Sequence, residues 1–290
     1  MELKKCFSWL ASVAAFALAI QAQQPGPGRA GAPRGNPLST KQPDLPANLF
    51  TSGSTIARTP LRHEWVNVPM GRVKLHTWVE YPEGQGKAPV VIVIHYDAGP
   101  DDLQLALADQ LASSGFIALV PDLLSGMAPK GGDYDSFPFP DDAIRAFAKM
   151  NRDEIMRRLK AAYDYGMRLP QANGKSAALG CGIGGTYSFE FAAEEPRLNA
   201  AVLFYGTAPG EQSMAKIKAP VLGLYGADDP IASTIDSTAA AMKRLGKSFE
   251  SHVYPNATHF FMTYAVEGEN GAATAQAWPR AITFLNENTK

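Results

Sequence analysis

Six residues, Gly180 to Gly185, constrain the fold more than any other segment of this 290-residue chain. They read Gly-Cys-Gly-Ile-Gly-Gly and stand between a short apolar run and a longer, helix-like run. A strand that turns sharply into a helix lifts its apex side chain above the sheet, and glycine is needed two residues to either side, where a Cβ would crowd the turn. With Gly180 and Gly184 at those crowded positions, the apex is Gly182. The segment therefore predicts a strand–turn–helix unit whose apex carries no side chain.

Strand-like and helix-like patterns alternate from residue 61 to the end of the chain. Val90 to His95 is a β-branched run typical of a strand buried on both faces, and Asp102 to Ser114 places leucines on one helical face. We expect an antiparallel hairpin at 63–81, further strands at 116–120, 176–179, 200–205, 221–225 and 249–254, and helices at 151–168, 184–195, 234–245 and 274–286. A long irregular segment runs from Ser125 to Pro140. This order predicts one α/β domain over 61–290, with a doubly wound, mostly parallel sheet and helices on both faces.

The first 60 residues have a different character. Lys4 and Lys5 precede an apolar, Ala-rich run from Phe7 to Ala22, which is typical of a secretory signal peptide at 1–22. A single membrane anchor is the alternative, but the run is short for a span. Residues 23–60 are rich in Pro and Gly and are expected to form a flexible lead-in. We therefore predict a secreted or periplasmic protein without membrane attachment after cleavage.

Composition narrows the class of partner. There are 27 Lys and Arg against 28 Asp and Glu, a balance that does not favour nucleic acid. None of the five histidines has metalloprotease spacing, so we expect no metal and no cofactor. After signal removal Cys181 is the single cysteine, which rules out an intramolecular disulfide. The oligomeric state cannot be predicted from these features.

Two polar segments follow the turn at successive predicted strand ends. Asp229 comes after the strand at 221–225, and His259 comes after the strand at 249–254. Nucleophile, acid and histidine follow this chain order in α/β-hydrolases, where the acid orients the histidine that takes the nucleophile's proton. Ordinary turn residues are the alternative. The order favours Asp229 and His259 as an acid and base pair.

With these segments in place, the chain resembles the dienelactone hydrolase family of α/β-hydrolases from about Leu61 to Leu285. The residues that carry the resemblance are Ala88–His95, Phe116–Leu123, Asn173–Lys175, Phe204–Gly206, the Asp229 and His259 segments, and Ala277–Arg280. The resemblance implies hydrolysis of enol-lactones and related esters through a cysteine nucleophile, with no cofactor. It also implies Asp229 and His259 at the acid and base positions, and the backbone N–H groups of Asp97 and Ile183 as oxyanion donors.

The chain departs from the family at two site positions. The family's elbow places its cysteine where this chain has Gly182, and the family's glutamate after the histidine of the first buried strand is Tyr96 here. Cys181 lies one residue too early. It either reaches the site because the glycine turn relaxes, or it is a buried, inert thiol. A third route has His259 activate water in the space left at Gly182.

Two functions remain open at this point. The first is an exported hydrolase of small esters or lactones. The second is a catalytically degenerate family member, a pseudoenzyme, that binds a small ester or carboxylate without turnover. Aromatic side chains of the irregular segment (Tyr134, Phe137 and Phe139) suggest an apolar ligand, although core packing explains them equally well.

Overall fold

The computed structural model describes residues 47–264 and 268–290, which all belong to one structural unit. The predicted signal peptide, with Cys6, and most of the predicted lead-in lie outside the described residues. Among the helices of the described residues, none is long and apolar enough to cross a membrane.

An eight-stranded sheet organises this unit, in the order β1-β2-β4-β3-β5-β6-β7-β8. The pairs β1–β2 and β2–β4 are antiparallel. The other six strands, β4, β3, β5, β6, β7 and β8 in sheet order, run parallel to one another. The strands are β1 (His63–Met70), β2 (Val73–Glu80), β3 (Ala88–Ile94), β4 (Ile117–Pro121), β5 (Ala172–Cys181), β6 (Ala200–Phe204), β7 (Val221–Gly226) and β8 (Phe249–Tyr254). This arrangement confirms the predicted doubly wound, mostly parallel sheet.

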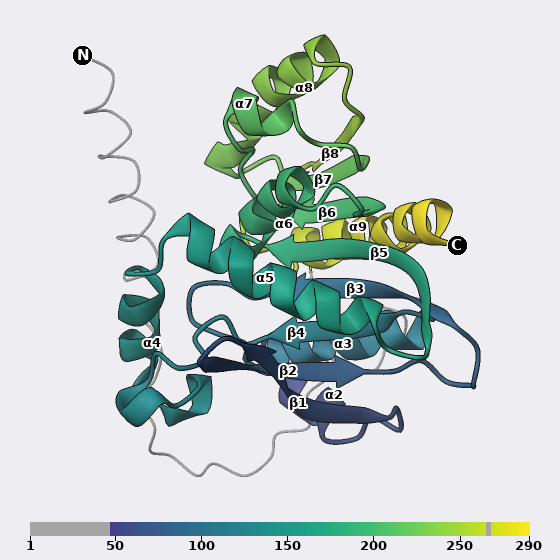
Figure 1. Ribbon diagram of the computed structural model, residues 1–290. Coiled ribbons are helices and arrows are strands. Elements are labelled where there is room, and N and C mark those ends of the chain that lie inside the picture. Colours follow the sequence, from purple (N-terminus) through teal and green to yellow (C-terminus); the bar gives the residue numbers. More distant parts are fainter. Residues whose placement is uncertain (1–46, 265–267) are drawn as a thin grey trace. The chain divides into compact units, whose positions relative to one another are not determined.

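Helices cover both faces of the sheet (Figure 1). The α-helices are α2 (Ser52–Ile56), α3 (Asp102–Ser113), α4 (Pro140–Phe147), α5 (Arg152–Met167), α6 (Ile183–Glu194), α7 (Glu211–Met214), α8 (Ile235–Arg244) and α9 (Gly268–Thr289). The irregular segment after β4 contains two short 3-10 turns, η1 (Pro129–Gly131) and η2 (Tyr134–Ser136), and a third, η3 (Pro230–Thr234), follows β7.

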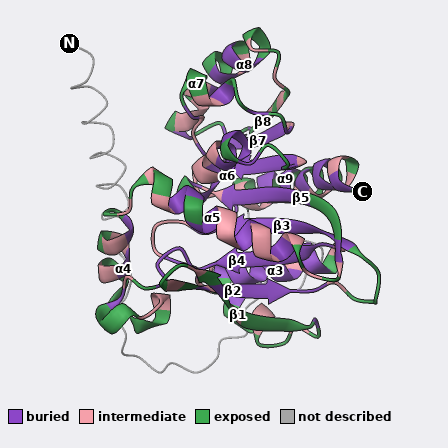
Figure 2. Cartoon of the chain, in the orientation of Figure 1, coloured by how far each residue is buried: buried purple, intermediate pink, exposed green. Residues whose placement is uncertain are grey.

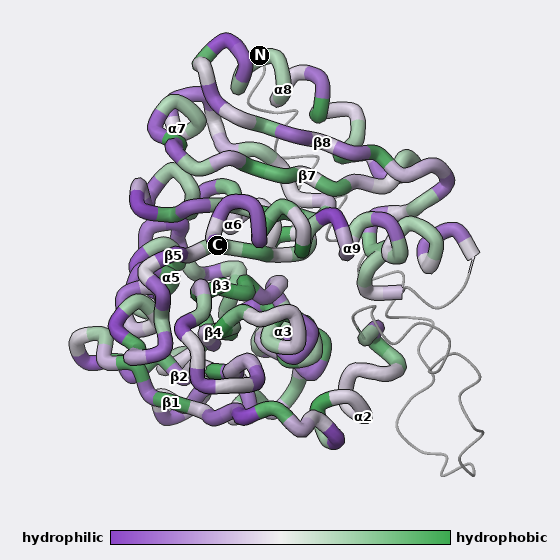
Figure 3. Tube along the Cα trace, turned by 90° about the vertical axis from the view of Figure 1, so that its right-hand side faces the viewer, coloured by the Kyte–Doolittle hydropathy of each residue, from purple (hydrophilic) through white to green (hydrophobic). Residues whose placement is uncertain are grey.

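The core has two layers because every second side chain of a strand points to the opposite face. In β3, Val90, Ile92 and Ile94 pack with α5 and α6, whereas Val91 and Val93 pack with α3 and α9. Seen from the side, α3 and α9 lie on one side of the strands and α5 on the other (Figure 3). Colouring by burial shows the central strands fully enclosed (Figure 2). The turn of interest is therefore anchored on the rigid middle of the sheet, where β5 runs into α6.

The packed structure begins before the predicted domain boundary at residue 61. Residues 47–60, which the composition places in the lead-in, pack on the domain through α2, which lies against α3. Asn48 and Ser52 are buried, Ile56 joins the apolar layer formed by α3 and α9, and the Leu49 N–H donates to the Thr263 carbonyl at 3.0 Å. Sequence patterning missed this segment because it contributes few large apolar side chains and attaches through backbone and polar contacts.

Candidate active site

The turn between β5 and α6 has the backbone of a nucleophile elbow. Gly182 lies at φ 56° and ψ −125°, a conformation that L-residues rarely adopt. A Cβ on Gly180 would lie 2.3 Å from backbone atoms of Gly184, and one on Gly184 would lie 2.2 Å from the Ile94 carbonyl oxygen. Neither position has room for a side chain. Steric crowding thus falls on the two flanking glycines and leaves Gly182 at the apex.

The structure brings Asp229 and His259 together. Asp229 follows β7 and His259 lies in the turn after β8, and these neighbouring parallel strands deliver both side chains to the same sheet edge. His259 Nδ1 lies 2.7 Å from Asp229 Oδ2, and the other carboxylate oxygen accepts from the Ile231 N–H at 2.9 Å. Because Asp229 is a carboxylate, His259 Nδ1 is the donor, which leaves Nε2 as the free nitrogen.

The free nitrogen of His259 faces the apex of the turn. A Cβ built on Gly182 would lie 3.9 Å from His259 Nε2, with no closer contact to any side chain. Within residues 47–264 and 268–290, no hydrogen-bond partner reaches Nε2. The geometry of a triad is therefore present around a position that carries no side chain.

Cys181 lies next to the apex but belongs to the sheet. It is the last residue of β5, pairs in register with Phe204 and packs against the apolar layer formed by α3 and α9. Burial raises the pKa of its thiol to about 12, and a hydrogen bond with the Tyr205 hydroxyl opposes this rise only in part. At neutral pH the thiol is protonated, which is the unreactive form.

Hydrolysis is expected to be insensitive to Cys181. We expect Cys181→Ala to keep ester turnover within about twofold of wild type, because the thiol is neutral and is hydrogen bonded to Tyr205 rather than to His259. The measurement is the initial rate with p-nitrophenyl acetate, accompanied by the rate of thiol alkylation by iodoacetamide in folded and unfolded protein. A loss of activity as large as that caused by His259→Ala would instead identify Cys181 as the nucleophile.

Tyr205 is a site residue that the sequence reasoning did not single out. It follows β6, adopts φ 45°, and its ring lies 4.9 Å from the His259 ring between centroids. Its Cε2 atom lies 3.9 Å from the Cβ position of Gly182, and its hydroxyl lies 3.4 Å from Thr263 Oγ1. A signal was available, since β6 neighbours β5 in a parallel sheet and the residue at its carboxyl end must lie beside the elbow.

The two predicted oxyanion donors have different surroundings. Ile183 begins α6, where the first N–H groups have no partner within the helix. The Asp97 carboxylate, in contrast, lies close to the backbone N–H groups of Asp97 and Ala98, which favour its charged form. Partial burial raises the pKa of the Asp97 carboxyl group. An oxyanion can use the Asp97 donor only if this carboxylate turns aside.

Tyr96, the residue predicted to stand at the position of the family's glutamate, has a carboxylate rather than a thiol as its hydrogen-bond partner. Its hydroxyl donates to Asp101, the residue that caps α3. The preceding His95 is fully buried, accepts the Leu123 N–H at Nε2 at 3.0 Å, and burial lowers its pKa to about 4. Both side chains hold the loop after β3 in place.

The aromatic side chains of the irregular segment are divided between core and surface. Tyr134 and Phe137 pack against the core, whereas Phe139 is 67% exposed. Among the described residues no cluster of three or more His, Cys, Asp or Glu side chains is arranged to hold a metal ion.

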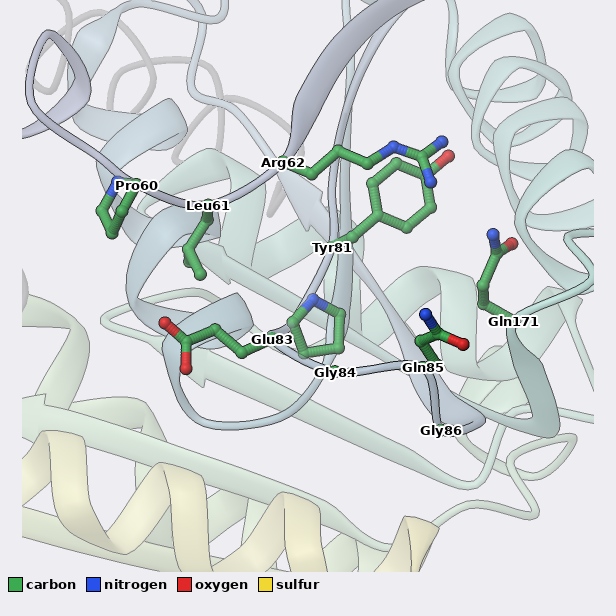
Figure 4. Close-up of a pocket in the computed structure, with 10 residues that line it drawn as sticks. Pro60, Leu61, Arg62, Tyr81, Glu83, Gly84, Gln85, Gly86 and Gln171 are labelled. Atoms are coloured by element: carbon green, nitrogen blue, oxygen red, sulfur yellow. The ribbon is translucent and has the colours of Figure 1, made fainter.

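A hollow of about 760 Å³ lies at the opposite, amino-terminal edge of the parallel strands (Figure 4). It is lined by Pro60–Arg62, by Tyr81–Gly86 and by Gln171, and the Arg62 guanidinium lies 4.1 Å from the Tyr81 ring centroid. Neither Gly182 nor His259 lines it. The hollow is therefore separate from the elbow and is not part of the candidate active site.

With the elbow, the acid and the histidine in place, comparison with known proteins decides the family. A family model described as the dienelactone hydrolase family matches residues 75–289. The chain belongs to the dienelactone hydrolase family. This confirms the resemblance inferred from the sequence and supports a hydrolase function at the level of the family.

Individual relatives are consistent with this family assignment. A protein of Saccharolobus solfataricus, provisionally named carboxymethylenebutenolidase, is 28% identical over 250 residues, which cover 75% of this chain and 95% of that protein. A solved dienelactone hydrolase of Anabaena variabilis is 21% identical with a TM-score of 0.60, and a dienelactone hydrolase-like promiscuous phosphotriesterase from metagenomic libraries is 24% identical with a TM-score of 0.66. Each solved structure covers 79% of this chain and is itself covered over 99% of its length. At these identities, the structural likenesses show the fold.

Proposed function

We propose that this member of the dienelactone hydrolase family hydrolyses small esters or lactones by a water route. His259 acts as the general base and Asp229 holds its orientation. One observation carries the proposal: the 2.7 Å contact between Asp229 and His259 is intact while the apex at Gly182, 3.9 Å from Nε2 at its Cβ position, is bare. The space that a nucleophilic side chain would fill is large enough for the oxygen of a water molecule.

The proposed reaction needs two proton transfers, one from water to His259 and one from His259 to the leaving group. Water at the apex attacks the ester carbonyl while His259 Nε2 accepts its proton, and the imidazolium then returns that proton to the leaving alcohol. Asp229 stabilises the imidazolium through Nδ1. The Ile183 N–H supports the negative oxygen of the tetrahedral intermediate. No covalent acyl-enzyme forms, so turnover is expected to be slow and without a burst.

His259→Ala tests this role. We expect it to lower kcat/KM for p-nitrophenyl acetate by about 100-fold, the ordinary contribution of a general base. Asp229→Asn is expected to lose activity as well, because the amide favours the wrong imidazole tautomer. Initial rates measured with purified protein at equal concentration provide the comparison.

Glu83→Gln, an exposed change at the far edge of the sheet, serves as the matched control and is expected to be neutral. Equal rates for wild type, His259→Ala and buffer across a panel of esters and lactones would rule the hydrolase out.

The second candidate function is binding of a small ester or carboxylate without turnover. Two observations favour it: no described nucleophilic side chain is hydrogen bonded to His259 Nε2, and the Asp97 carboxylate lies close to one of the predicted oxyanion donors. This function predicts that an ester binds with a measurable Kd but remains intact, as judged by NMR of the ligand after prolonged incubation.

Export is part of the proposal and rests on residues 1–22 alone. The short basic region and the apolar run from Phe7 to Ala22 support a cleaved signal peptide. Mass spectrometry of protein recovered from outside the cytoplasm tests it: a mature chain that begins near Gln23 supports export, and an intact chain confined to the cytoplasm refutes it.

A further inference from the structure

We propose that this site selects neutral or cationic substrates and disfavours anionic ones, because acidic side chains far outnumber cations in the loops at the edge of the sheet that carries His259. The inference rests on the proposed function, since it names the substrate class of the same site. It also departs from the relatives: the name carboxymethylenebutenolidase denotes action on a lactone with a carboxyl-bearing substituent, which is ionised at neutral pH.

The charges of the loops at the elbow edge are strongly unequal. These loops follow the parallel strands and span residues 95–101, 122–139, 205–210, 227–229 and 255–264. Their acidic side chains, here called the acidic rim, are Asp97, Asp101, Asp122, Asp133, Asp135, Asp228 and Asp229. Lys130 is the one Lys or Arg among these described loop residues. A ligand that approaches the elbow therefore meets a predominantly negative field.

Asp97 is a member of the acidic rim that lies near the start of α6. It follows β3, the strand that pairs with β5, and its carboxylate lies within electrostatic range of the hydroxyl of Tyr187, which belongs to the first turns of α6. This carboxylate lies close to the backbone N–H groups of Asp97 and Ala98, and no ion pair joins it to a cation within the described residues. A substrate carboxylate near the start of α6 would thus meet a like charge.

The other rim carboxylates are divided between structural and open positions. Asp122 and Asp229 are buried and hydrogen bonded, so they shape the loops. Asp135 and Asp228 are exposed. The exposed pair contributes to the long-range field and can be changed without breaking a side-chain contact.

Three arginines on the adjoining helices α4 and α5 are held in ion pairs. Arg152 contacts Glu190 at 2.6 Å and Glu194 at 2.8 Å, and Arg158 contacts Glu154 at 2.7 Å. In α4, Arg145 contacts Asp142 at 2.6 Å.

Arg72 and Lys74 remain, in the hairpin of β1 and β2. Two strands, β4 and β3, separate that hairpin from β5, and Asp133 and Asp135 line a hollow with Trp65 and His76 of the same hairpin. These two cations therefore lie on the side of the rim that those two carboxylates form. None of these cations is placed to pair with a substrate carboxylate at the apex.

The uncharged part of the site is aromatic. Phe260 lies edge-on to His259 with 4.4 Å between ring centroids, and Tyr264 continues the group at 6.2 Å from Phe260. Tyr205 closes another side, and Ile183 leaves 39% of its surface exposed at the elbow. These surfaces favour an apolar or aromatic ligand, and they offer an anionic group no compensation for its lost hydration.

Three matched esters test the inference: p-nitrophenyl butyrate, which is neutral, p-nitrophenyl hemisuccinate, which is anionic, and p-nitrophenyl 4-(trimethylammonio)butyrate, which is cationic. At low ionic strength we expect kcat/KM for the anionic ester to be at least about tenfold below that for the neutral ester. The gap is expected to narrow at 1 M salt, where the Debye length falls to about 3 Å. The cationic ester is expected to match or exceed the neutral one.

Charge reversal at the exposed rim positions provides the second arm. The double variant D135K/D228K is expected to raise the ratio of anionic to neutral kcat/KM at least about threefold at low salt. Glu83→Lys makes the same kind of change at the opposite sheet edge and is expected to leave the ratio unchanged. A wild-type ratio near one, insensitive to salt and to both variants, would overturn the inference while leaving the hydrolase intact.

Binding separates this inference from the proposed function. N-phenylbutanamide and N-phenylsuccinamate copy the neutral and anionic esters without a cleavable bond, and the Ile183 amide resonance reports on their binding. If no ester is cleaved but the neutral amide binds at least about tenfold more tightly, the hydrolase fails and the charge selection stands. Equal affinity, or no binding of either amide, overturns the charge selection.

Discussion

Gly182→Cys is expected to raise the rate of p-nitrophenyl acetate hydrolysis by about 100-fold or more, because it restores an attacking side chain to an otherwise complete constellation. The Cβ fits without collision, at 3.9 Å from both His259 Nε2 and Tyr205 Cε2, and Sγ then lies within reach of the imidazole. A covalent acyl-enzyme becomes possible. The expected signature is a burst of p-nitrophenolate that iodoacetamide abolishes.

Gly182→Ala is the matched control for this gain. Both substitutions place a Cβ at φ 56°, and we expect each to lower the free energy of unfolding by about 1–3 kcal/mol. Only the cysteine variant should gain activity, and adding His259→Ala to it should remove the gain. A folded Gly182→Cys protein without a reactive thiol would show that the side chain at 182 does not point toward His259.

Stability is expected to fall as pH rises from about 5 to about 8, because a buried carboxyl pair shares a proton in the folded state. Glu80 is fully buried beside Asp109, and desolvation together with that neighbour raises the pKa of Glu80 to about 8. Trp78 Nε1 donates to one Glu80 oxygen at 2.9 Å, and Thr59 donates to Asp109. The other Glu80 oxygen has no partner unless it carries a proton and donates to Asp109.

The direction of the change in the free energy of unfolding follows from the number of protons that the folded and unfolded chains bind. Between the unfolded pKa of a glutamate and the raised folded value, the folded chain binds more protons, so the free energy of unfolding decreases with pH and levels off above pH 8. The loss is on the order of 2–5 kcal/mol. Glu80→Gln keeps a permanent donor to Asp109 and an acceptor for Trp78. It should therefore remove the part of the pH dependence of stability that is due to Glu80.

Urea unfolding of wild type and Glu80→Gln at pH 5, 7 and 9 measures the effect. We expect the variant to be the more stable protein at pH 9 and to show no advantage at pH 5. The difference between the two proteins isolates Glu80 from the other buried carboxyl groups, and Glu83→Gln controls for loss of a surface charge. Parallel pH dependence in wild type and Glu80→Gln would contradict a shared proton.

Local patterns were sufficient for the elements and for the elbow. β-branched runs such as Val90–His95 and the glycine spacing around Gly182 report on contacts made within a few residues of themselves, so the sequence carries them directly. The contact between Asp229 and His259 could be predicted from the sequence for a different reason. Both residues follow strands predicted to be parallel, and parallel strands end at a common edge.

Other contacts could not be read from the sequence because they depend on distant partners. The segment from Ala47 to Thr59 looks like a linker, yet it packs on α3 through helix α2. The strand end that carries Tyr205 could be placed beside the elbow, but the contact of its ring with His259 depends on how the sheet twists. The Asp97 carboxylate folds back onto its own N–H, a local choice that side-chain identity does not specify.

The hydrogen bond from the Leu49 N–H to the Thr263 carbonyl joins the segment before the first strand to the turn that carries His259. Thr263 stands four residues after His259 and also lies against the Tyr205 hydroxyl. A protein shortened to begin at residue 61 would keep every strand yet lose the tether on the histidine-bearing turn. Maturation that trims the chain beyond Ala47 would therefore act on the reaction centre, whereas trimming before it would leave that tether whole.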